Sequence, residues 1–404
     1  MSGKGNLLRG ACLQGRLPRR DFLIKAIAAP FVLASPSFAA TNIDPAAAAL
    51  GGDLTPSPVS DGLGIAAPSD LNFDATALHR VLEVVQGGST NIHSVLVLRH
   101  GKLAAELYRP GTDRSIYSLW SSRKSFASAD FHDMRSISKS VVGLLYGILL
   151  DRGEVPGIET SVSSLYPEYP ALHDTARRAI LVRHLLSMTA GLEWTEPSPV
   201  RRASSTDETG LALRSCSYSY VFAREIVASP GAQFTYSGGL TSVLAEIMAR
   251  STKRSLRQIV DDELFAPLGI VDWEWVGDVY GRPMAAAGLR LKPRDLAKLA
   301  AMMLARGEWQ GRRVVPADWI AQSIKPSIET APVGGYGFQW WSMTTRWKDK
   351  DLPATVAIGN GGQRLFLVPD LDLALVTTAG DYGDPAIAAP LDAILHSIVM
   401  AVLT

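Results

Sequence analysis

The chain has 404 residues, of which 47% are hydrophobic and 20% are charged, and its formal net charge is +1. This composition is ordinary for a globular protein, and the length suits one large or two medium-sized domains. Because basic residues are not in excess, the charge gives no support to nucleic-acid binding.

Residues 1–40 have the layout of a secretory leader. They contain six basic residues and one acidic residue, with an apolar stretch from Ala26 to Ala34 before a run of small residues. Arg19 and Arg20 add a twin-arginine pattern. We therefore expect a twin-arginine signal peptide, with Ser37-Phe38-Ala39 as its cleavage tripeptide, and a bacterial protein that is periplasmic or secreted. Since the apolar run is shorter than the roughly 20 residues of a membrane span, no stable span is expected after removal of the leader.

The cysteines fit the same division of the chain. Only Cys12 and Cys216 are present, and Cys12 falls inside the predicted leader. The mature protein would then keep one cysteine, so we expect its stability to come from the core, with Cys216 a buried structural residue. Residues 41–72, rich in Ala, Pro, Gly and Ser, are predicted to be a linker or a loosely attached arm.

Strands are predicted near both ends of the remaining chain, and helices between them. Apolar runs within 94–108 and within 365–378 each flank a polar turn, which is typical of β-hairpins. Helical periods occur at 180–189, 240–250 and 256–265, and an amphipathic helix is expected within 385–404. The order predicts an α/β fold, an antiparallel sheet flanked by helices (about 73–150 and 285–404) with an inserted, mostly helical domain (about 151–284).

Ser136-Ile137-Ser138-Lys139 is the most informative motif. It directly precedes an apolar run of helical period, Val141 to Leu149. Ser136 would therefore lie in the first helical turn, with Lys139 one turn later on the same face. A serine hydroxyl needs a neighbouring base, and a lysine near the positive end of a helix can be held neutral enough to help. The pattern predicts a Ser-x-x-Lys active site. The alternative is an ordinary helix start with a polar first turn.

The same four-residue pattern occurs at Ser121 to Lys124. That match lies in a polar stretch, 118–128, with no apolar helix after it. A serine in such a loop would have no fixed geometry toward its lysine, so the sequence context favours Ser136.

Tyr236 is the predicted proton-transfer partner of this motif. It lies where a compact Pro- and Gly-containing turn leads into the helix predicted at 240–250. A free tyrosine has a pKa of about 10, and a nearby lysine ammonium would lower that pKa. Lys139 and Tyr236 could then share the proton of Ser136 as one coupled pair. The alternative is that Tyr236, like most of the 11 tyrosines, is a packing residue.

A third segment, Gly359-Asn360-Gly361-Gly362-Gln363, opens the strand predicted at 365–368. Its glycines would let the backbone approach a ligand closely. The backbone N–H groups at this strand and at Ser136 could form a two-donor oxyanion hole. The alternative is a common Gly-rich turn.

The three motifs have the order and rough spacing of the serine β-lactamase and penicillin-binding-protein superfamily. Within this superfamily, the chain more closely resembles the β-lactamase-related serine hydrolases that include 6-aminohexanoate-dimer hydrolases and class C-like esterases. Three further stretches fit this family: Val182 to Leu192, Ala287 to Leu296 and Tyr336 to Trp341. The resemblance covers roughly Asp74 to Thr378.

The resemblance implies a β-lactamase/transpeptidase-like fold and a role for each motif. Ser136 would be the acylated nucleophile, Lys139 its proton partner and Tyr236 the general base that later activates water. The amides of Ser136 and Gln363 would hold the oxyanion. Other residues expected to line the substrate site are Asn360, Gly361, Gly362 and Gly238.

Two positions depart from the pattern of penicillin-binding proteins and class C β-lactamases. Gly238 stands where their second motif has Asn, and Asn360 stands where their third motif has a lysine for the substrate carboxylate. An amide cannot supply that charge, so efficient β-lactam hydrolysis is not expected. Trp340 and Trp341 could line the cleft or pack in the core.

The leading interpretation is a secreted serine hydrolase acting on small-molecule esters or amides. The alternatives are a D-amino-acid peptidase or β-lactamase and, from another class, a non-catalytic binding protein on a degenerate hydrolase fold. The sequence contains no Gly-x-Ser-x-Gly motif, no metal-binding spacing among its seven histidines and no nucleotide-binding glycine loop. No metal or cofactor and no nucleic-acid partner is therefore expected, and no particular oligomeric state is indicated.

Overall fold

The computed structural model describes residues 55–403 except 117, 119, 197–205 and 331–333. The predicted signal peptide and Cys12 lie outside the described residues. Within the described residues, no helix is both long enough and apolar enough to cross a bilayer.

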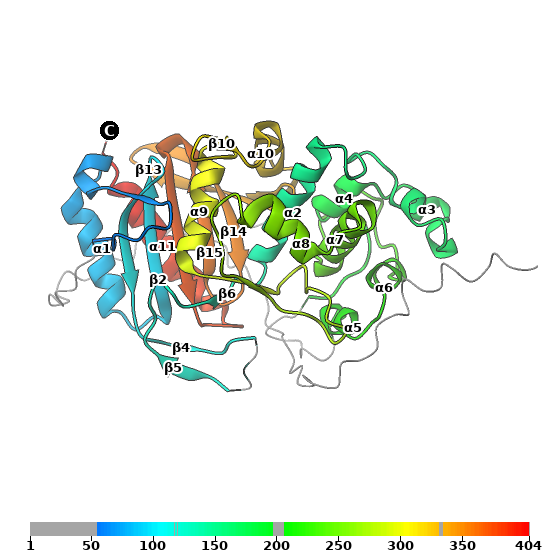
Figure 1. Ribbon diagram of the computed structural model, residues 1–404, viewed down its shortest axis with the longest axis horizontal. Helices are drawn as coiled ribbons and strands as arrows, with labels where there is room; N and C mark the ends of the chain where they lie inside the picture. The colour runs from blue at the N-terminus through cyan, green and yellow to red at the C-terminus, as the bar shows by residue number, and fades with distance from the viewer. Residues whose placement is uncertain (1–54, 117, 119, 197–205, 331–333, 404) are drawn as a thin grey trace, which may run out of the picture.

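A nine-stranded sheet forms the larger part of the molecule (Figure 1). Its strands pair antiparallel except for the first, which adds parallel to the edge. In spatial order they are β1 (Gly64–Ile65), β3 (Lys102–Tyr108), β2 (Ile92–Arg99), β16 (Leu373–Ala379), β15 (Gln363–Val368), β14 (Lys350–Gly359), β13 (Trp341–Trp347), β12 (Gly334–Tyr336) and β11 (Ile328–Thr330).

The central strands are buried on both faces because helices cover both. β2, β15 and β16 contain no exposed residue, which explains their nearly continuous apolar sequence. One face packs against α9 (Pro293–Leu304) and part of α2 (Ile137–Asp151). Helices α1 (Ala75–Gly87) and α11 (Ala388–Met400) pack against each other, and α11 also packs on the sheet. This layering confirms the predicted α/β fold.

Both predicted hairpins are confirmed. β2 and β3 pair antiparallel across the turn at His100 and Gly101, and both of these residues have positive φ. β15 and β16 pair across a short turn, Pro369–Leu371, followed by Asp372 at φ 48°. Asp372 and Gly101 thus occupy the left-handed region that such reversals require.

A mostly helical part lies beside the sheet, with α2 between the two (Figure 1). Its helices are α3 (Thr175–Arg178), α4 (Val182–Leu186), α5 (Asp207–Ala212), α6 (Ser217–Phe222), α7 (Gly238–Thr252) and α8 (Leu256–Val260), which continues into a π-helical turn at Asp261–Phe265. α4 is shorter than the period at 180–189 predicted, whereas α7 is longer than predicted. Ser237 caps α7 by accepting a hydrogen bond from the amide of Leu240.

Smaller elements complete the fold. They are α10 (Ala317–Ile324), the three-stranded sheet of β6 (His132–Asp133), β8 (Leu289–Leu291) and β7 (Glu274–Trp275), and the two-stranded pairs β4 (Gly111–Asp113) with β5 (Ser122–Lys124) and β9 (Glu308–Trp309) with β10 (Arg312–Arg313). β6 leads directly into α2, so its pairing with β8 fixes the start of that helix.

The described part of the predicted arm lies against the body of the protein. β1 pairs with β3, and Leu63 and Leu71 are buried. Asp61 forms an ion pair with Arg294 of α9 at 3.1 Å. From residue 55 this segment is therefore integrated into the sheet domain.

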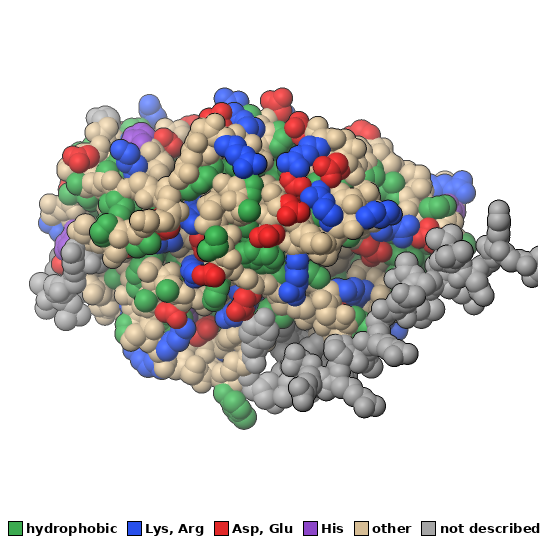
Figure 2. All heavy atoms as spheres, in the orientation of Figure 1, with side chains coloured by type: hydrophobic (Ala, Val, Ile, Leu, Met, Phe, Trp, Pro, Cys, Tyr) green, Lys and Arg blue, Asp and Glu red, His purple; other side chains and the backbone are tan. Residues whose placement is uncertain are grey.

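Basic and acidic side chains are interspersed over the face shown in Figure 2. The second Ser-x-x-Lys match lies on the surface: Lys124 is at the end of β5 and pairs with Asp130 at 2.9 Å. The Lys124 side chain is thus an exposed partner of a carboxylate, in line with the preference for Ser136.

Candidate active site

Ser136 lies at the start of α2, as predicted, and its position is set by a tight turn. The preceding residue, Arg135, has φ 50°, a conformation that costs about 1 kcal/mol or more for a non-glycine residue. The turn is held because Ser138 donates its hydroxyl to the carbonyl of Arg135 and accepts a hydrogen bond from the amide of Leu289. Ser136 is half-buried, whereas Lys139 is 1% exposed. The hydroxyl is thus accessible while the amine beside it is shielded from water.

Lys139 connects the three predicted catalytic residues. Its Nζ lies 3.0 Å from Ser136 Oγ and 3.2 Å from the carbonyl oxygen of Ala286. The same Nζ lies 4.7 Å from the centre of the Tyr236 ring. The Tyr236 hydroxyl hydrogen-bonds with both Ser136 and Lys139. The structure therefore brings Ser136, Lys139 and Tyr236, which span 100 residues of sequence, into one hydrogen-bonded group.

The protonation of this group differs from the prediction. Burial raises the pKa of Tyr236, and the Lys139 ammonium and the Ser136 hydroxyl lower it only in part, so the net direction is upward. Lys139 lowers the pKa of Tyr236 as expected, but desolvation outweighs this effect of the charge. Burial alone would lower the pKa of Lys139, but Tyr236, Glu196 and Glu208 outweigh it and raise that pKa. These neighbours therefore favour the ammonium form of Lys139 over the neutral amine.

Tyr236 is held by an aromatic cluster. Its ring lies 5.5 Å from that of Trp341 and 6.2 Å from that of Tyr336, and Phe234 packs against all three. These contacts leave the phenol oxygen as the polar end of an otherwise apolar group. Trp341 thus packs beside the site, while Trp340 is 2% exposed.

Gln339 joins α2 to α7 and was missed by sequence reasoning. Its carbonyl accepts a hydrogen bond from Ser140 of α2 at 2.7 Å, and its Oε1 accepts one from Thr241 of α7 at 2.8 Å. Its Nε2 donates to the carbonyls of Leu185 and Leu186. One buried amide thereby fixes the two helices that position Ser136 and Tyr236.

The third motif is the turn between β14 and β15. Gly359 pairs with Gln363, and Gly361 and Gly362 have φ of 92° and 99°. A Cβ on Gly359 would lie 2.3 Å from the carbonyl oxygen of Met134, so this glycine allows the hairpin to approach the turn before α2. The proposed pairing of the Ser136 and Gln363 amides as an oxyanion hole stays a prediction.

The side chains of this motif turn toward the sheet and the loop after β16. Asn360 Oδ1 accepts a hydrogen bond from the amide of Gly383 at 2.9 Å. The Gln363 side chain exchanges hydrogen bonds with the backbone of Ala379. Both contacts hold the β14–β15 turn against the neighbouring strand, and neither supplies a positive charge.

Glu196 and Glu208 are the other residues that sequence reasoning missed. Glu196 Oε1 accepts hydrogen bonds from the amide of Gly238 at 2.6 Å and from the indole of Trp194 at 3.0 Å. Burial first, and then the neighbouring Glu208, raises the pKa of Glu196 well above its usual value. The sequence pointed to these two glutamates only through Gly238, because a residue without a side chain leaves room for a group from another segment.

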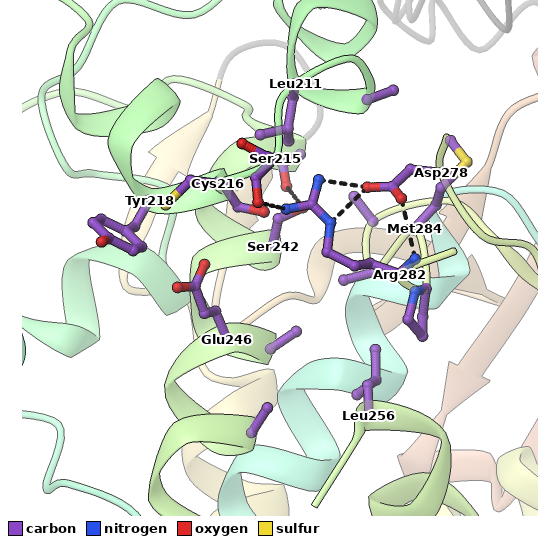
Figure 3. A pocket seen from close by; sticks show the side chains of 18 of the residues that line it. Leu211, Ser215, Cys216, Tyr218, Ser242, Glu246, Leu256, Asp278, Arg282 and Met284 are labelled. Carbon is purple, nitrogen blue, oxygen red and sulfur yellow. Dashed lines mark hydrogen bonds and ion pairs between the residues drawn. The ribbon is translucent and has the colours of Figure 1, made fainter. Parts of the chain in front are cut away.

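A cavity of about 630 Å³ lies behind this part of the site, along α7. Figure 3 shows Glu246 of α7 beneath Tyr218 and Cys216, with Arg282 bonded to Asp278 on the other side. Gly238 and Glu208 are in its wall together with Ala286, the acceptor of the Lys139 hydrogen bond. None of the three predicted catalytic residues lines it. Cys216, expected to be buried, is half-buried at this wall.

Across the described ranges, no group of three or more His, Cys, Asp or Glu side chains is arranged to hold a metal ion. The described site brings a hydroxyl, an ammonium and a phenol into contact.

The β-lactamase family model matches residues 83–396 of this chain. That range includes all three motifs and most of both parts of the fold. The chain belongs to the β-lactamase family. It is a β-lactamase-related serine hydrolase of the esterase and amidase type.

Particular relatives agree with this assignment. The chain is 28% identical over 299 residues to a 6-aminohexanoate-dimer hydrolase of Paenarthrobacter ureafaciens, with 70% of each protein covered. A penicillin-binding-protein homologue of Caulobacter crescentus has a similar fold, with TM-score 0.62, 16% identity and coverage of 83% of this chain and 99% of that one. A D-amino acid amidase of Ochrobactrum anthropi has TM-score 0.58, 18% identity and coverage of 81% and 98%.

Proposed function

We propose that this family member is an exported hydrolase that cleaves small ester or amide bonds through an acyl-enzyme on Ser136. The observation that carries the proposal is the 3.0 Å contact between Lys139 Nζ and Ser136 Oγ at the start of α2. A half-buried hydroxyl beside a buried amine and a phenol is the arrangement expected of an activated nucleophile.

The first half of the reaction forms the acyl-enzyme. Ser136 Oγ attacks the substrate carbonyl carbon, and its proton passes to the Lys139–Tyr236 pair, which must have released one proton beforehand. The carbonyl oxygen becomes an oxyanion and accepts hydrogen bonds from the amides of Ser136 and Gln363. The carbon–nitrogen or carbon–oxygen bond then breaks, and the pair returns the proton to the leaving amine or alcohol.

The second half regenerates the enzyme. Water replaces the departed group, and Tyr236 accepts its proton as the water oxygen attacks the acyl carbon. The ester bond to Ser136 breaks, and the serine oxygen regains a proton from the pair. Loss of one oxyanion donor in sites of this kind costs about 3 to 4 kcal/mol of barrier.

The substrate class follows from the relatives and from two residues. One relative is named a 6-aminohexanoate-dimer hydrolase and another a D-amino acid amidase. Asn360 provides no positive charge for a substrate carboxylate, and its side chain bonds to Gly383. We therefore favour small esters and amides over β-lactams. The amidase likeness keeps D-amino-acid amides or peptides as the second candidate.

The deciding experiment compares turnover of short-chain nitrophenyl esters by the mature protein and by Ser136→Ala. Activity in the first and none in the second supports the acyl-enzyme, and intact-mass analysis after fluorophosphonate treatment should show one adduct that the variant lacks. Equal turnover in both proteins would exclude Ser136. A protein inert to esters, to a panel of amides and to fluorophosphonate would be a binding protein on a hydrolase fold.

A second variant tests Tyr236. Tyr236→Phe keeps the ring among Phe234, Tyr336 and Trp341, so the fold should persist. Its kcat/KM should fall about 10²- to 10⁴-fold, the usual contribution of general acid–base catalysis. Near-full turnover would exclude Tyr236 as the base.

Export is part of the proposal and rests on the sequence of residues 1–40. Replacement of Arg19 and Arg20 by lysine should keep the precursor in the cytoplasm of a bacterial host, while the unchanged chain is recovered from the periplasm. Equal distribution of both chains would contradict export by the twin-arginine route.

A further inference from the structure

Glu196 holds the turn that carries Tyr236. It comes from the loop after Leu192, and its Oε1 accepts the amide proton of Gly238 at 2.6 Å and the Trp194 indole proton at 3.0 Å. Gly238 is two residues from Tyr236 and begins α7. The position of the carboxylate therefore fixes both the start of the helix and the phenol ahead of it.

Glu208 fills the space beside that turn. It lies on α5, and its Oε1 is 2.5 Å from the point where a Cβ on Gly238 would stand, while Glu196 Oε1 is 3.5 Å from the same point. A side chain at residue 238 and the Glu208 carboxyl group cannot occupy this volume together. A carboxyl group from another helix thus occupies the place that a side chain at residue 238 would take.

The two carboxyl groups lie beside each other, since Glu208 Oε1 and Glu196 Oε1 are 2.5 and 3.5 Å from the same point next to Gly238, and Glu208 adds to burial in raising the pKa of Glu196. An ionised carboxylate only accepts hydrogen bonds, so a bond between two carboxyl groups requires a proton on one of them. Two carboxyl groups so close together do not both ionise readily, because the charge of the first carboxylate opposes ionisation of the second. The pair thus carries one proton and one negative charge.

Several charged or titratable groups face this pair. Lys139 approaches from α2, Tyr236 from the turn before α7 and Tyr336 from β12. On α5 itself, the neighbouring Asp207 is neutralised by Arg224 at 3.0 Å. The negative charge of the Glu196–Glu208 pair therefore acts on the Lys139 ammonium.

We propose that Glu196 and Glu208 form a proton-sharing positioning pair, which fills the space beside Gly238 and sets the charge of Lys139. This inference rests on the proposed function, since it concerns the proton-transfer group of the same site. Neither glutamate touches the reacting atoms, and both act through Gly238 and Lys139.

The sign of the effect follows from electrostatics. A negative charge near Lys139 favours the ammonium, and the Lys139–Tyr236 pair must lose a proton before it can accept that of Ser136. Removal of this charge should let the pair lose its proton at lower pH. The acid limb of the pH profile, which is the part where kcat/KM rises with pH, should then move toward lower pH.

Glutamine substitutions separate a shared proton from two independent charges. In Glu208→Gln the amide donates to Glu196 as a protonated carboxyl group does, and in Glu196→Gln the charge resides on Glu208. Each single variant keeps one negative charge, so its acid limb should stay close to that of the unchanged enzyme. The double variant has no charge, and its limb should move by about one pH unit, equal to about tenfold higher kcat/KM on the acid side.

The matched control replaces Glu193 and Glu225 by glutamine together. Both are exposed. Glu193 precedes Glu196 in the same loop, and Glu225 lies in the segment before Tyr236. The control should leave the profile unchanged. A double Glu196→Gln/Glu208→Gln variant that matches the unchanged enzyme would overturn the proposal, and so would single variants that each shift as far as the double one.

A measurement without turnover tests the shared proton independently. The infrared carbonyl stretch of a protonated carboxyl group, recorded at about pH 8, should be weaker in each single glutamine variant than in the unchanged protein. Unaltered absorption in both variants would overturn the proposal even if the double variant failed to fold. The unchanged protein could show the infrared band of the shared proton while its Ser136 reacts with neither esters nor fluorophosphonate. In that case the proposed function fails, but the proposal of a proton-sharing Glu196–Glu208 pair stands.

Discussion

Glu208 Oε1 lies 2.5 Å from the position that a Cβ would take on Gly238, although 30 residues separate them in the chain. Gly238→Asn would therefore force the Glu208 carboxyl group away from residue 238 and from Glu196. We expect a loss of about 1 to 3 kcal/mol in the free energy of unfolding, measured by chemical denaturation.

The compensating variant is Gly238→Asn combined with Glu208→Ala. Removing the Glu208 carboxyl group vacates the space that the asparagine needs, so the double variant should regain stability relative to Gly238→Asn alone. Strictly additive losses would show that Glu208 does not limit the size of residue 238.

Lys139→Met tests the buried amine. Without Lys139, Ser136 loses its 3.0 Å partner, and the rate of fluorophosphonate labelling should fall about 10²- to 10⁴-fold. Lys124→Met, in the exposed second Ser-x-x-Lys match, is the control and should label at the unchanged rate. Circular dichroism of both variants checks the fold. Equal labelling of both would remove Lys139 from the mechanism.

The pH dependence of turnover follows from the raised pKa of both Lys139 and Tyr236. A pair whose pKa values lie above the usual ones keeps its proton at neutral pH, so kcat/KM should increase as the pH rises from about 6 to 10 and fall as the pH is lowered. A neutral nitrophenyl ester avoids titration of the substrate. A profile with its maximum at acidic pH would contradict a protonated resting pair.

We expect the buried imidazole of His93 to make the folded protein less stable in acid. Burial lowers the pKa of His93 to about 4, helped by Lys124 and Arg109, while its bond to the Thr112 carbonyl opposes the shift. In the unfolded chain His93 is therefore protonated below about pH 6.5, whereas in the folded chain it is protonated only below about pH 4. Stability is lost over that window as pH falls, by about 3 kcal/mol at pH 4.

His93→Gln should remove that share of the acid sensitivity. The difference in unfolding free energy between pH 7 and pH 4 should become smaller by about 3 kcal/mol. His79→Gln, at an exposed position of α1, should leave the difference unchanged. Identical pH dependence of His93→Gln and the unchanged protein would mean that His93 is not buried in its neutral form.

Gln339→Leu tests the link between α2 and α7. The substitution leaves the buried carbonyl of Leu185 and the hydroxyl of Thr241 without their side-chain partner, while the Leu186 carbonyl keeps only its bond from the backbone N–H of residue 339. We expect a decrease of about 3 kcal/mol in the free energy of unfolding. Gln322→Leu, exposed on α10, should change it by less than about 0.5 kcal/mol. Equal stability of the two variants would contradict the role of Gln339.

Local periodicity predicted most of the fold because hairpins and apolar helices are specified by neighbouring residues. The β2–β3 and β15–β16 hairpins follow from apolar runs on either side of a polar turn, and the α2 helix follows from its period of three to four residues. The pairing of β2 with β16 could not be predicted in this way. It joins segments more than 270 residues apart, whose apolar faces fit many partners equally well.

The sequence by itself determined which residues could be reactive, since Ser136 and Lys139 are one helical turn apart and their spacing is fixed by the helix. Only the tertiary structure decided the charge of that pair. Burial raises the pKa of Tyr236, whereas burial of Lys139 is outweighed by Tyr236, Glu196 and Glu208, which raise the pKa of the lysine. These effects depend on segments distant in the chain. Electrostatic interactions act through space and through the solvent that packing excludes, so no local pattern records them.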